Sequence, residues 1–372
     1  MRPHLLIPHG FEANYTVGFA RGLKANDVAF VVLSDNDIAA RLDGAGIPHR
    51  NIRGSVDPRR GRLSKIVNFV RYYLALLTAT IRHRGRTQHF TGLLLSRFIW
   101  WEGLLLPVWL RIWAGRYVHT AHNVLPHGRE RQRRFRWAYR WIYRFPHHIV
   151  AHCQATSDQL QRDFGVPADR ITVISIGLNE EMPQPDLTPA QAKAELGLGS
   201  ERLMLFFGKV EPYKGVDRLV EAWPQVSAPS QLAIAGLSID PAYGSQVRAA
   251  ILSSARPIRW EEGHVPNERA ALWLTAADAL VLPYRHIYQS GLVFLSQRFG
   301  LPVIATDVGS MREYVDADSG LIAEDNSAEG LATAINRFLA DPDRFSRGEI
   351  MRRAAKFSWS AQCALIRLLY LP

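Results

Sequence analysis

The sequence predicts an α/β protein built from two Rossmann-like, doubly wound domains. Three observations support this prediction. The chain has 372 residues, too many for one hydrophobic core of ordinary size. Short apolar runs of strand length alternate with segments of helix length, an order typical of parallel sheets covered by helices. The alternation stops at about residues 177–200, a polar stretch punctuated by Pro183, Pro185 and Pro189, which we interpret as a linker.

We expect residues 1–176 to form the N-terminal domain. Its expected strands are 4–7, 28–33, 117–120, 148–151 and 171–174. The expected helices begin with one at about 14–24, and the helix after the second strand should end near Gly44 and Gly46. The apolar run at the start is too short for the hydrophobic part of a signal peptide, so we interpret it as a strand.

We expect residues 201–345 to form the second domain. Its expected strands are 203–207, 231–235, 279–282 and 302–305, each bounded by Gly or Pro and separated by helical segments. Because ligands of doubly wound sheets bind beyond the carboxyl ends of the strands, we expect the ligand site in a cleft between the two domains.

The charge of the chain is distributed unevenly. Its net charge is +11, but the first 150 residues hold 24 Lys and Arg against 8 Asp and Glu, and the rest of the chain is net negative. This asymmetry predicts that the N-terminal half faces an anionic partner, which could be a nucleic acid, a membrane leaflet or a phosphorylated acceptor. The two cysteines, Cys153 and Cys363, build no disulfide framework and favour a reducing compartment.

Two stretches of the N-terminal half could meet a membrane. Residues 92–113 are strongly apolar, but Arg97, Glu102 and Arg111 interrupt them, so they do not read as a spanning helix. They fit either a buried helix or a surface at the bilayer interface. Residues 129–144 interleave arginines with aromatic residues, and residues 50–86 are also basic. Such segments are either interfacial helices on anionic lipid or solvated helices whose aromatic side chains face the core.

The strongest local motif follows the first strand of the second domain. After the strand, Gly208 allows close approach of a ligand, Lys209 and Lys214 follow, and a helix should begin near Val216. Backbone N–H groups at a helix start, with cationic side chains beside them, can bind phosphate. Neither the Walker pattern nor G-x-G-x-x-G is present, so the motif is not a P-loop or a dinucleotide fingerprint.

Three stretches resemble the GT4-type glycosyltransferases, in an exopolysaccharide or lipopolysaccharide branch. They are GKVEPYKGVDRLVEA at 208–222, AADALVLPY at 276–284, and FGLPVIATDVG at 299–309, followed by Glu313. The resemblance implies the GT-B architecture, in which two Rossmann-like domains face each other across a cleft. It also implies that residues 346–372 form a C-terminal helix that crosses back to the N-terminal domain, and that Lys209 and Lys214 hold the donor diphosphate beside Gly208.

The chain departs from the family at the E-x7-E motif. The expected position, 288–297, reads YQSGLVFLSQ and holds no carboxylate. The backbone N–H groups of Ser290 and Gly291, at an expected helix start, could still face a diphosphate. Without the carboxylates, retention and inversion of the anomeric centre both stay open.

The resemblance also implies roles for two loops of the N-terminal domain and one of the second. His122 matches the family's histidine next to the transferred sugar, and Asn123 follows it. Glu12 is the one carboxylate of the opening loop and would be the general base if the reaction inverts, although it could instead cap a helix. The remaining expected contacts are Gly10, Phe11 and Asn14 for the acceptor or sugar, and Trp260, Val265 and Pro266 for the nucleotide base.

These expectations amount to a metal-independent glycosyltransferase without a cofactor. The donor would be a GDP- or UDP-linked sugar, and the acceptor a saccharide on polyprenyl diphosphate in bacterial surface polysaccharide assembly. We expect a cytoplasmic chain that lies peripherally on the inner, anionic face of the membrane. No His or Cys cluster has metal-site spacing, and no nucleic-acid motif appears. A non-catalytic nucleotide-binding scaffold and an inverting transferase are the alternatives.

Overall fold

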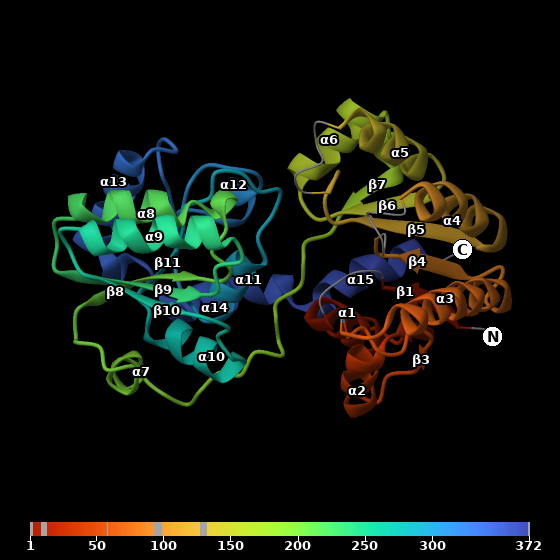
Figure 1. Cartoon of the computed structure of the whole chain (residues 1–372), viewed down its shortest axis with the longest axis horizontal. Coiled ribbons are helices and arrows are strands. Elements are labelled where there is room, and N and C mark those ends of the chain that lie inside the picture. The colour runs from red at the N-terminus through yellow and green to blue at the C-terminus, as the bar shows by residue number, and fades with distance from the viewer. Residues whose placement is uncertain (1–2, 9–12, 58, 93–98, 127–131, 371–372) are drawn as a thin grey trace. The chain divides into compact units, whose positions relative to one another are not determined.

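The computed structural model describes residues 3–8, 13–57, 59–92, 99–126 and 132–370. The chain divides into two compact units, each built around one parallel sheet (Figure 1). The first unit joins Met1–Gly177 to Phe357–Pro372, and the second is Leu178–Lys356. The predicted fold class, with two doubly wound parallel sheets, is confirmed.

The sheet of the first unit has seven parallel strands in the order β3-β2-β1-β4-β5-β6-β7. The strands are β1 His4–Ile7, β2 Phe30–Ser34, β3 His49–Asn51, β4 Thr87–Phe90, β5 Arg116–Ala121, β6 His148–Ala151 and β7 Ile171–Val173. β5 and β6 are neighbours whose ends are in register, since Ala121 pairs with Ala151. The residues that follow these two alanines therefore meet at the same edge of the sheet.

Helices cover both faces of this sheet. They are α1 Ala13–Ala25, α2 Asn36–Gly44, α3 Arg62–Arg82, α4 Ile99–Trp113, α5 Arg133–Arg144, α6 Gln154–Phe164 and α15 Trp359–Tyr370, with a 3-10 turn η2 at Ala168–Arg170. One core cluster joins the sheet to α1, α2 and α15, and another joins it to α3 and α4. Trp359 of α15 lies so close to α1 that a Cβ at Gly18 would lie 2.1 Å from its ring nitrogen.

The sheet of the second unit has six parallel strands in the order β10-β9-β8-β11-β12-β13. The strands are β8 Arg202–Phe207, β9 Ser230–Gly236, β10 Ile258–Glu262, β11 Ala279–Leu282, β12 Val303–Ala305 and β13 Gly320–Ile322. Its α-helices are α7 Pro189–Glu195, α8 Val216–Ala222, α9 Pro241–Ser253, α10 Asn267–Ala276, α11 Gly291–Arg298, α12 Met311–Tyr314, α13 Ala328–Ala340 and α14 Arg347–Ala354. The 3-10 turns are η3 Pro212–Lys214, η4 Trp223–Gln225, η5 Pro342–Arg344 and η6 Ala355–Phe357. Helices α8, α9 and α13 cover one face, and α10 and α14 the other (Figure 1).

The boundaries between the units differ from the expected ones. The stretch expected to be a linker holds α7, which begins with a capping box formed by Thr188 and Gln191 and packs on α10 of the second unit. The chain rejoins the first unit at 357, whereas the sequence prediction placed the return at 346. The reason is α14, which packs on α11 within the second unit.

In the part of the chain that the structure describes, no helix is long and apolar enough to cross a membrane. Within the apolar stretch, residues 99–113 form α4, with Pro107 inside the helix.

Candidate functional site

The predicted donor turn of the second unit is held by two glycines packed backbone to backbone. Gly208 follows β8 with φ +114°. Its N–H donates to Ala235 O at 3.0 Å, an ordinary hydrogen-bond distance. At Gly236, the last residue of β9, a Cβ would lie 1.9 Å from Gly208 O. Any side chain at 236 would therefore push the turn out of place.

Lys214 lies beside this turn. Its Nζ is 3.5 Å from the position of a Cβ at Gly208. Lys214 ends η3, and the next residue, Gly215, has φ +66° and lies so close to β11 that a Cβ would be 2.1 Å from Pro283 O. The backbone thus fixes Lys214 at the end of β8. Lys209, in contrast, is exposed beside the same turn.

The start of α11 meets the same turn. Ser290 is the N-cap, and its hydroxyl accepts from Leu292 N at 3.3 Å and lies 3.2 Å from the Tyr284 hydroxyl. Leu292 Cδ1 is 3.4 Å from the Cβ position of Gly208. The structure therefore brings Gly208, Lys214 and the Ser290–Gly291 helix start together. The combination of an ammonium group with a helix N-terminus suits a diphosphate.

An ion pair that the sequence did not reveal, between Arg285 and Asp217, holds the backbone next to this site. Arg285 donates to both carboxylate oxygens of Asp217, at 2.7 and 2.8 Å, and to Pro212 O at 3.0 Å. Asp217 also accepts from the Tyr243 hydroxyl at 2.7 Å, and hydrogen bonds from Arg285 and Tyr243 lower its pKa against the effect of burial. The Arg285–Asp217 pair ties η3 and α8 to the segment after β11, so it holds the backbone on either side of Lys214.

Trp260 lies beside the same pair of glycines. Its indole N–H donates to Gly236 O at 3.1 Å, and the Arg248 guanidinium lies 5.7 Å from its ring centroid. Val265 and Pro266 follow in the loop between β10 and α10, where Pro266 is exposed. Trp260 is thus placed next to the predicted donor turn. Contacts of Val265 and Pro266 with that turn stay a prediction.

In the first unit, His122 follows β5 and meets His152, which follows β6. Their facing nitrogens, Nδ1 and Nε2, are 3.2 Å apart, and His152 Nδ1 lies 2.8 Å from Ile174 O. The Tyr15 ring packs edge-on against His122, with centroids 4.6 Å apart. His122 is buried, and its ring lies between His152 and Tyr15.

Burial keeps the imidazoles of His119, His122 and His152 uncharged at neutral pH. Burial, with the neighbouring His152, His119 and His89, lowers the pKa of His122 well below its usual value. Burial lowers the pKa of His119 to about 3 and that of His152 to about 4. A neutral His122 can donate or accept one hydrogen bond to a sugar hydroxyl, but it does not bring a positive charge to the site.

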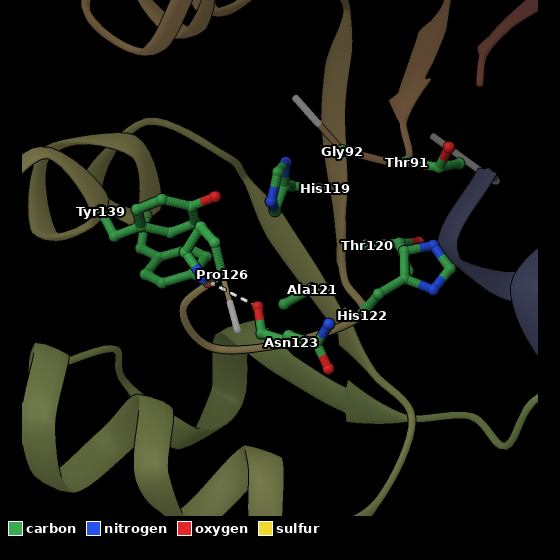
Figure 2. Close-up of a pocket in the computed structure, with 10 residues that line it drawn as sticks. Thr91, Gly92, His119, Thr120, Ala121, His122, Asn123, Pro126 and Tyr139 are labelled. Atoms are coloured by element: carbon green, nitrogen blue, oxygen red, sulfur yellow. Dashed lines mark hydrogen bonds between the residues drawn. The ribbon is translucent and has the colours of Figure 1, made fainter. Parts of the chain in front are cut away.

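A pocket of about 170 Å³ opens at the end of β5 (Figure 2). Its lining residues are Thr91, Gly92, His119, Thr120, Ala121, His122, Asn123, Pro126, Tyr139 and Tyr143. Thr91 Oγ1 and His119 Nδ1 are both buried, and neither has a hydrogen-bond partner among the residues that the structure describes. The polar groups that face this pocket are therefore uncharged and able to pair with hydroxyl groups.

The residues of this unit that were predicted to contact sugar or acceptor lie in different places. His122 and Asn123 line the pocket, and their contact with the transferred sugar stays a prediction. Asn14 is on α1, and its side-chain oxygen accepts from Arg41 at 2.8 Å. Gly10, Phe11 and Glu12 lie outside the described residues. Sequence reasoning did not propose His152, although the repeated Ala-His pairs after β5 and β6 could have pointed to it.

Within the described part of the chain, no three His, Cys, Asp or Glu side chains gather where they could hold a metal ion.

Two family models match the chain, one for each unit. The model described as Glycosyltransferase Family 4 matches residues 13–181, and the model described as Glycosyl transferases group 1 matches residues 201–341. Together the two matches indicate a glycosyltransferase of GT4 type and GT-B fold. They support the family predicted from the sequence motifs, while its exopolysaccharide or lipopolysaccharide branch stays a prediction.

Curated relatives of this chain include a D-inositol 3-phosphate glycosyltransferase of Thermobispora bispora. It is 31% identical over 240 residues, which are 60% of this chain and 55% of the relative. The protein of the same name from Frankia alni is 33% identical over 210 residues, 52% of this chain and 51% of the relative. These matches span about half the length of the curated relatives.

Solved structures match this chain over almost its whole length. Sucrose-phosphate synthase from Thermosynechococcus elongatus has a TM-score of 0.74 at 20% identity, covering 100% of this chain and 98% of that one. HepE of Anabaena, in complex with UDP-glucose, has a TM-score of 0.74 at 14% identity, covering 98% and 99%. At such low identities the likeness shows the shared GT-B fold.

Proposed function

We propose that this chain transfers a sugar from a nucleotide-diphosphate sugar to a hydroxyl group of an acceptor. The observation that supports this proposal most is the meeting of Gly208, Lys214 and the N-terminus of α11 at the ends of β8 and β11. An ammonium group and a helix start together can stabilise the diphosphate that leaves when the glycosidic bond to the donor breaks. Lys209 is exposed beside the turn and would reach the same diphosphate.

A UDP-linked sugar is the first donor to test, with a GDP-linked sugar as the second. HepE of Anabaena, which shares the fold, is described in complex with UDP and with UDP-glucose. The Trp260 ring beside Gly236 offers an aromatic surface for the base, and the loop with Val265 and Pro266 follows the same strand.

The pocket in the first unit suits the hydroxyl-bearing part of the reaction. Its buried polar groups, among them Thr91, His119 and His122, carry no charge at neutral pH. We propose that His122 and Asn123 contact the transferred sugar or the acceptor. Glu12 stays the proposed general base of an inverting reaction, and a retaining reaction would not require it.

For the acceptor, we propose a saccharide on polyprenyl diphosphate, used in surface polysaccharide assembly at the inner face of the membrane. The basic N-terminal half supports an anionic, membrane-bound acceptor. The relatives named D-inositol 3-phosphate glycosyltransferases make a soluble polyol phosphate the second acceptor class to test. In both classes the acceptor combines hydroxyl groups with phosphate.

The first experiment is thermal unfolding of the purified chain with UDP, GDP, ADP and CMP. A ligand at about 100 times its Kd stabilises the folded state by about 2.7 kcal/mol. We expect a clear rise in Tm with one nucleoside diphosphate and its loss in Lys214→Ala. The matched control is Lys356→Ala, which removes an exposed lysine of the second unit and should keep the rise. The proposal fails if no nucleotide raises the Tm of the unaltered chain.

A second assay, which measures nucleotide release, separates an enzyme from a non-catalytic scaffold. We expect slow release of UDP or GDP from the matching nucleotide sugar in the presence of acceptor lipid extract. Nucleotide binding without any release, with lipid-linked and polyol phosphate acceptors both supplied, would favour the scaffold.

A further inference from the structure

Helix α3 has a row of large apolar side chains that face solvent. Leu63 is 75% exposed, and Ile66, Val67, Val70 and Leu74 are 51–61% exposed. Their spacing of three, four and seven residues puts all five on one side of the helix. We call these five residues the α3 stripe.

The opposite side of α3 is apolar as well and is already packed. Tyr72, Tyr73, Leu76 and Ala79 are buried in the core between the helix and the sheet. A helix that covers a sheet normally turns its polar side to water. The α3 stripe therefore has no role in the core of this unit, and an exposed apolar patch of this kind marks a surface that docks onto something.

The neighbouring helices extend the patch. α4 packs between α3 and α5, and Leu105 and Ile112 of α4 are 52% and 67% exposed, while Trp137 of α5 is 53% exposed. Figure 1 shows these three helices in the first unit, in orange to olive. An exposed Trp suits the level of lipid headgroups, where its apolar ring and polar N–H are both accommodated.

The charges on the three helices narrow the choice of partner. α3, α4 and α5 hold ten Lys and Arg residues, and α3 and α5 hold no acidic residue. The one carboxylate of the three helices, Glu102, is 1% exposed. A second copy of this chain would bring the same positive charge to the same face and be repelled, whereas a bilayer with anionic headgroups would attract it.

We propose that the face formed by α3, α4 and α5 is the bilayer-binding surface of this chain, with the α3 stripe inserted among anionic phospholipid headgroups. This inference rests on the membrane-bound acceptor of the proposed function and names the surface and the side chains that would serve it. Arg62 and Arg71, which are exposed on α3 near the stripe, would contact phosphate groups.

The test is co-sedimentation of the full chain with two kinds of vesicle, pure phosphatidylcholine and a mixture of phosphatidylcholine with phosphatidylglycerol. We expect binding to the mixed vesicles that weakens as salt rises, and little binding to the neutral ones. The double variant Ile66→Gln and Val67→Gln should bind the mixed vesicles at least about tenfold more weakly, since two exposed side chains lose their apolar character. The control Leu252→Gln changes a residue of α9 that is 87% exposed and should bind like the unaltered chain.

Three results would overturn the inference. One is equal binding of the double variant and the unaltered chain, another is equal binding of the unaltered chain to neutral and mixed vesicles, and the third is a stripe-dependent dimer in solution. The Tm without nucleotide, measured on the same samples, reports whether the double variant is folded, and the nucleotide-induced rise in Tm reports on the donor site. If the unaltered chain shows no such rise but its vesicle binding requires Ile66 and Val67, the donor site fails and the bilayer surface stands.

Discussion

His122 shows how the fold decides the chemical character of a single residue. The sequence allowed a neutral or a protonated imidazole at this position. The structure buries His122 against His152 and Tyr15, and its pKa lies well below the usual value. A protonated ring would have to lose its hydration on burial, beside the other imidazoles His152, His119 and His89. His122 therefore acts as a neutral hydrogen-bonding group.

A first prediction concerns His122→Gln, which keeps a polar side chain but changes the ring geometry. We expect kcat/KM for sugar transfer to fall by about 10² to 10³, the usual cost of losing one well-placed hydrogen bond to the transition state. The rise in Tm with the nucleoside diphosphate should be unchanged, because the donor turn lies in the other unit. Steady-state kinetics and thermal unfolding measure the two effects. Unaltered kcat/KM would exclude His122 from the reaction.

A second prediction concerns acid stability. Burial lowers the pKa of His89 and His119 to about 3 and that of His152 to about 4, and His122 is shifted in the same direction. In the unfolded chain these groups take up protons near pH 6.5. Between pH 6.5 and 4 the unfolded state binds more protons than the folded state. The contribution of these histidines to the free energy of unfolding is therefore complete above pH 6.5 and falls as the pH drops below it.

Urea unfolding at several pH values between 7.5 and 5 measures this slope. The variant His119→Gln should show a shallower slope, and His264→Gln, which alters an exposed loop residue, should leave it unchanged. A stability that does not vary between pH 7 and 5 would contradict the burial of these histidines.

At the scale of elements, the second unit depends on close approach between turns. Gly208 and Gly236 end neighbouring strands, and Gly215 packs against the end of β11. These contacts place η3, α8 and α11 around one point. The Arg285–Asp217 ion pair then joins η3 and α8 to the segment after β11. Lys214 is positioned by backbone packing as much as by its own side chain.

A third prediction compares Gly236→Ala with Gly263→Ala. Both glycines have positive φ, +156° and +144°, so both substitutions strain the backbone. A Cβ at 236 meets Gly208 O at 1.9 Å, whereas a Cβ at 263 meets nothing within 4 Å. We expect Gly236→Ala to lower the free energy of unfolding by about 2 kcal/mol more than Gly263→Ala. It should also abolish the nucleotide-induced rise in Tm. Equal effects of the two substitutions would show that the Gly208 contact is unimportant.

The sequence predicted the architecture because apolar strand runs such as 203–207 and 279–282 are buried on both faces and read clearly. It missed β10, an edge strand in which apolar and charged residues mix, and α7, which is short and lies among prolines. The motifs grouped Lys214 and Ser290 with Gly208, and the structure places them close together, while their part in diphosphate binding stays a prediction. Spacing could not show the Arg285–Asp217 pair or the meeting of His122 with His152, because both depend on which strands are neighbours in the sheet.

At the scale of the whole molecule, the last helix belongs to the first unit. α15 packs along α1, and the Trp359 ring fills space that glycines leave for it, since a Cβ at Gly18 or Gly177 would overlap the ring. Asn26 of the same unit donates to Ser360 O at 2.8 Å, and the Tyr370 hydroxyl lies 2.7 Å from His89 Nδ1. The core of the first unit is therefore incomplete without residues from the end of the chain.

A fourth prediction follows for Trp359→Ala. Trp359 is 4% exposed, and its removal should lower the stability of the first unit by about 3–5 kcal/mol. The second unit holds no part of this contact, so we expect it to keep its nucleotide-induced stabilisation while the first unit melts earlier. Calorimetry should show two transitions in the variant. A single transition that shifts as a whole would mean that the two units unfold together.

The place of α15 also sets the order in which the molecule can be completed as it leaves the ribosome. The whole of Leu178–Lys356 is synthesised before Trp359 appears. The second unit can therefore reach its native state while the first, although begun earlier, still exposes the apolar side of α1 that α15 will cover. Nascent chains usually finish their domains from the amino end onwards. Here the domain that starts first is finished last, and the uncovered side of α1 is a surface that a chaperone would meet on every newly made copy.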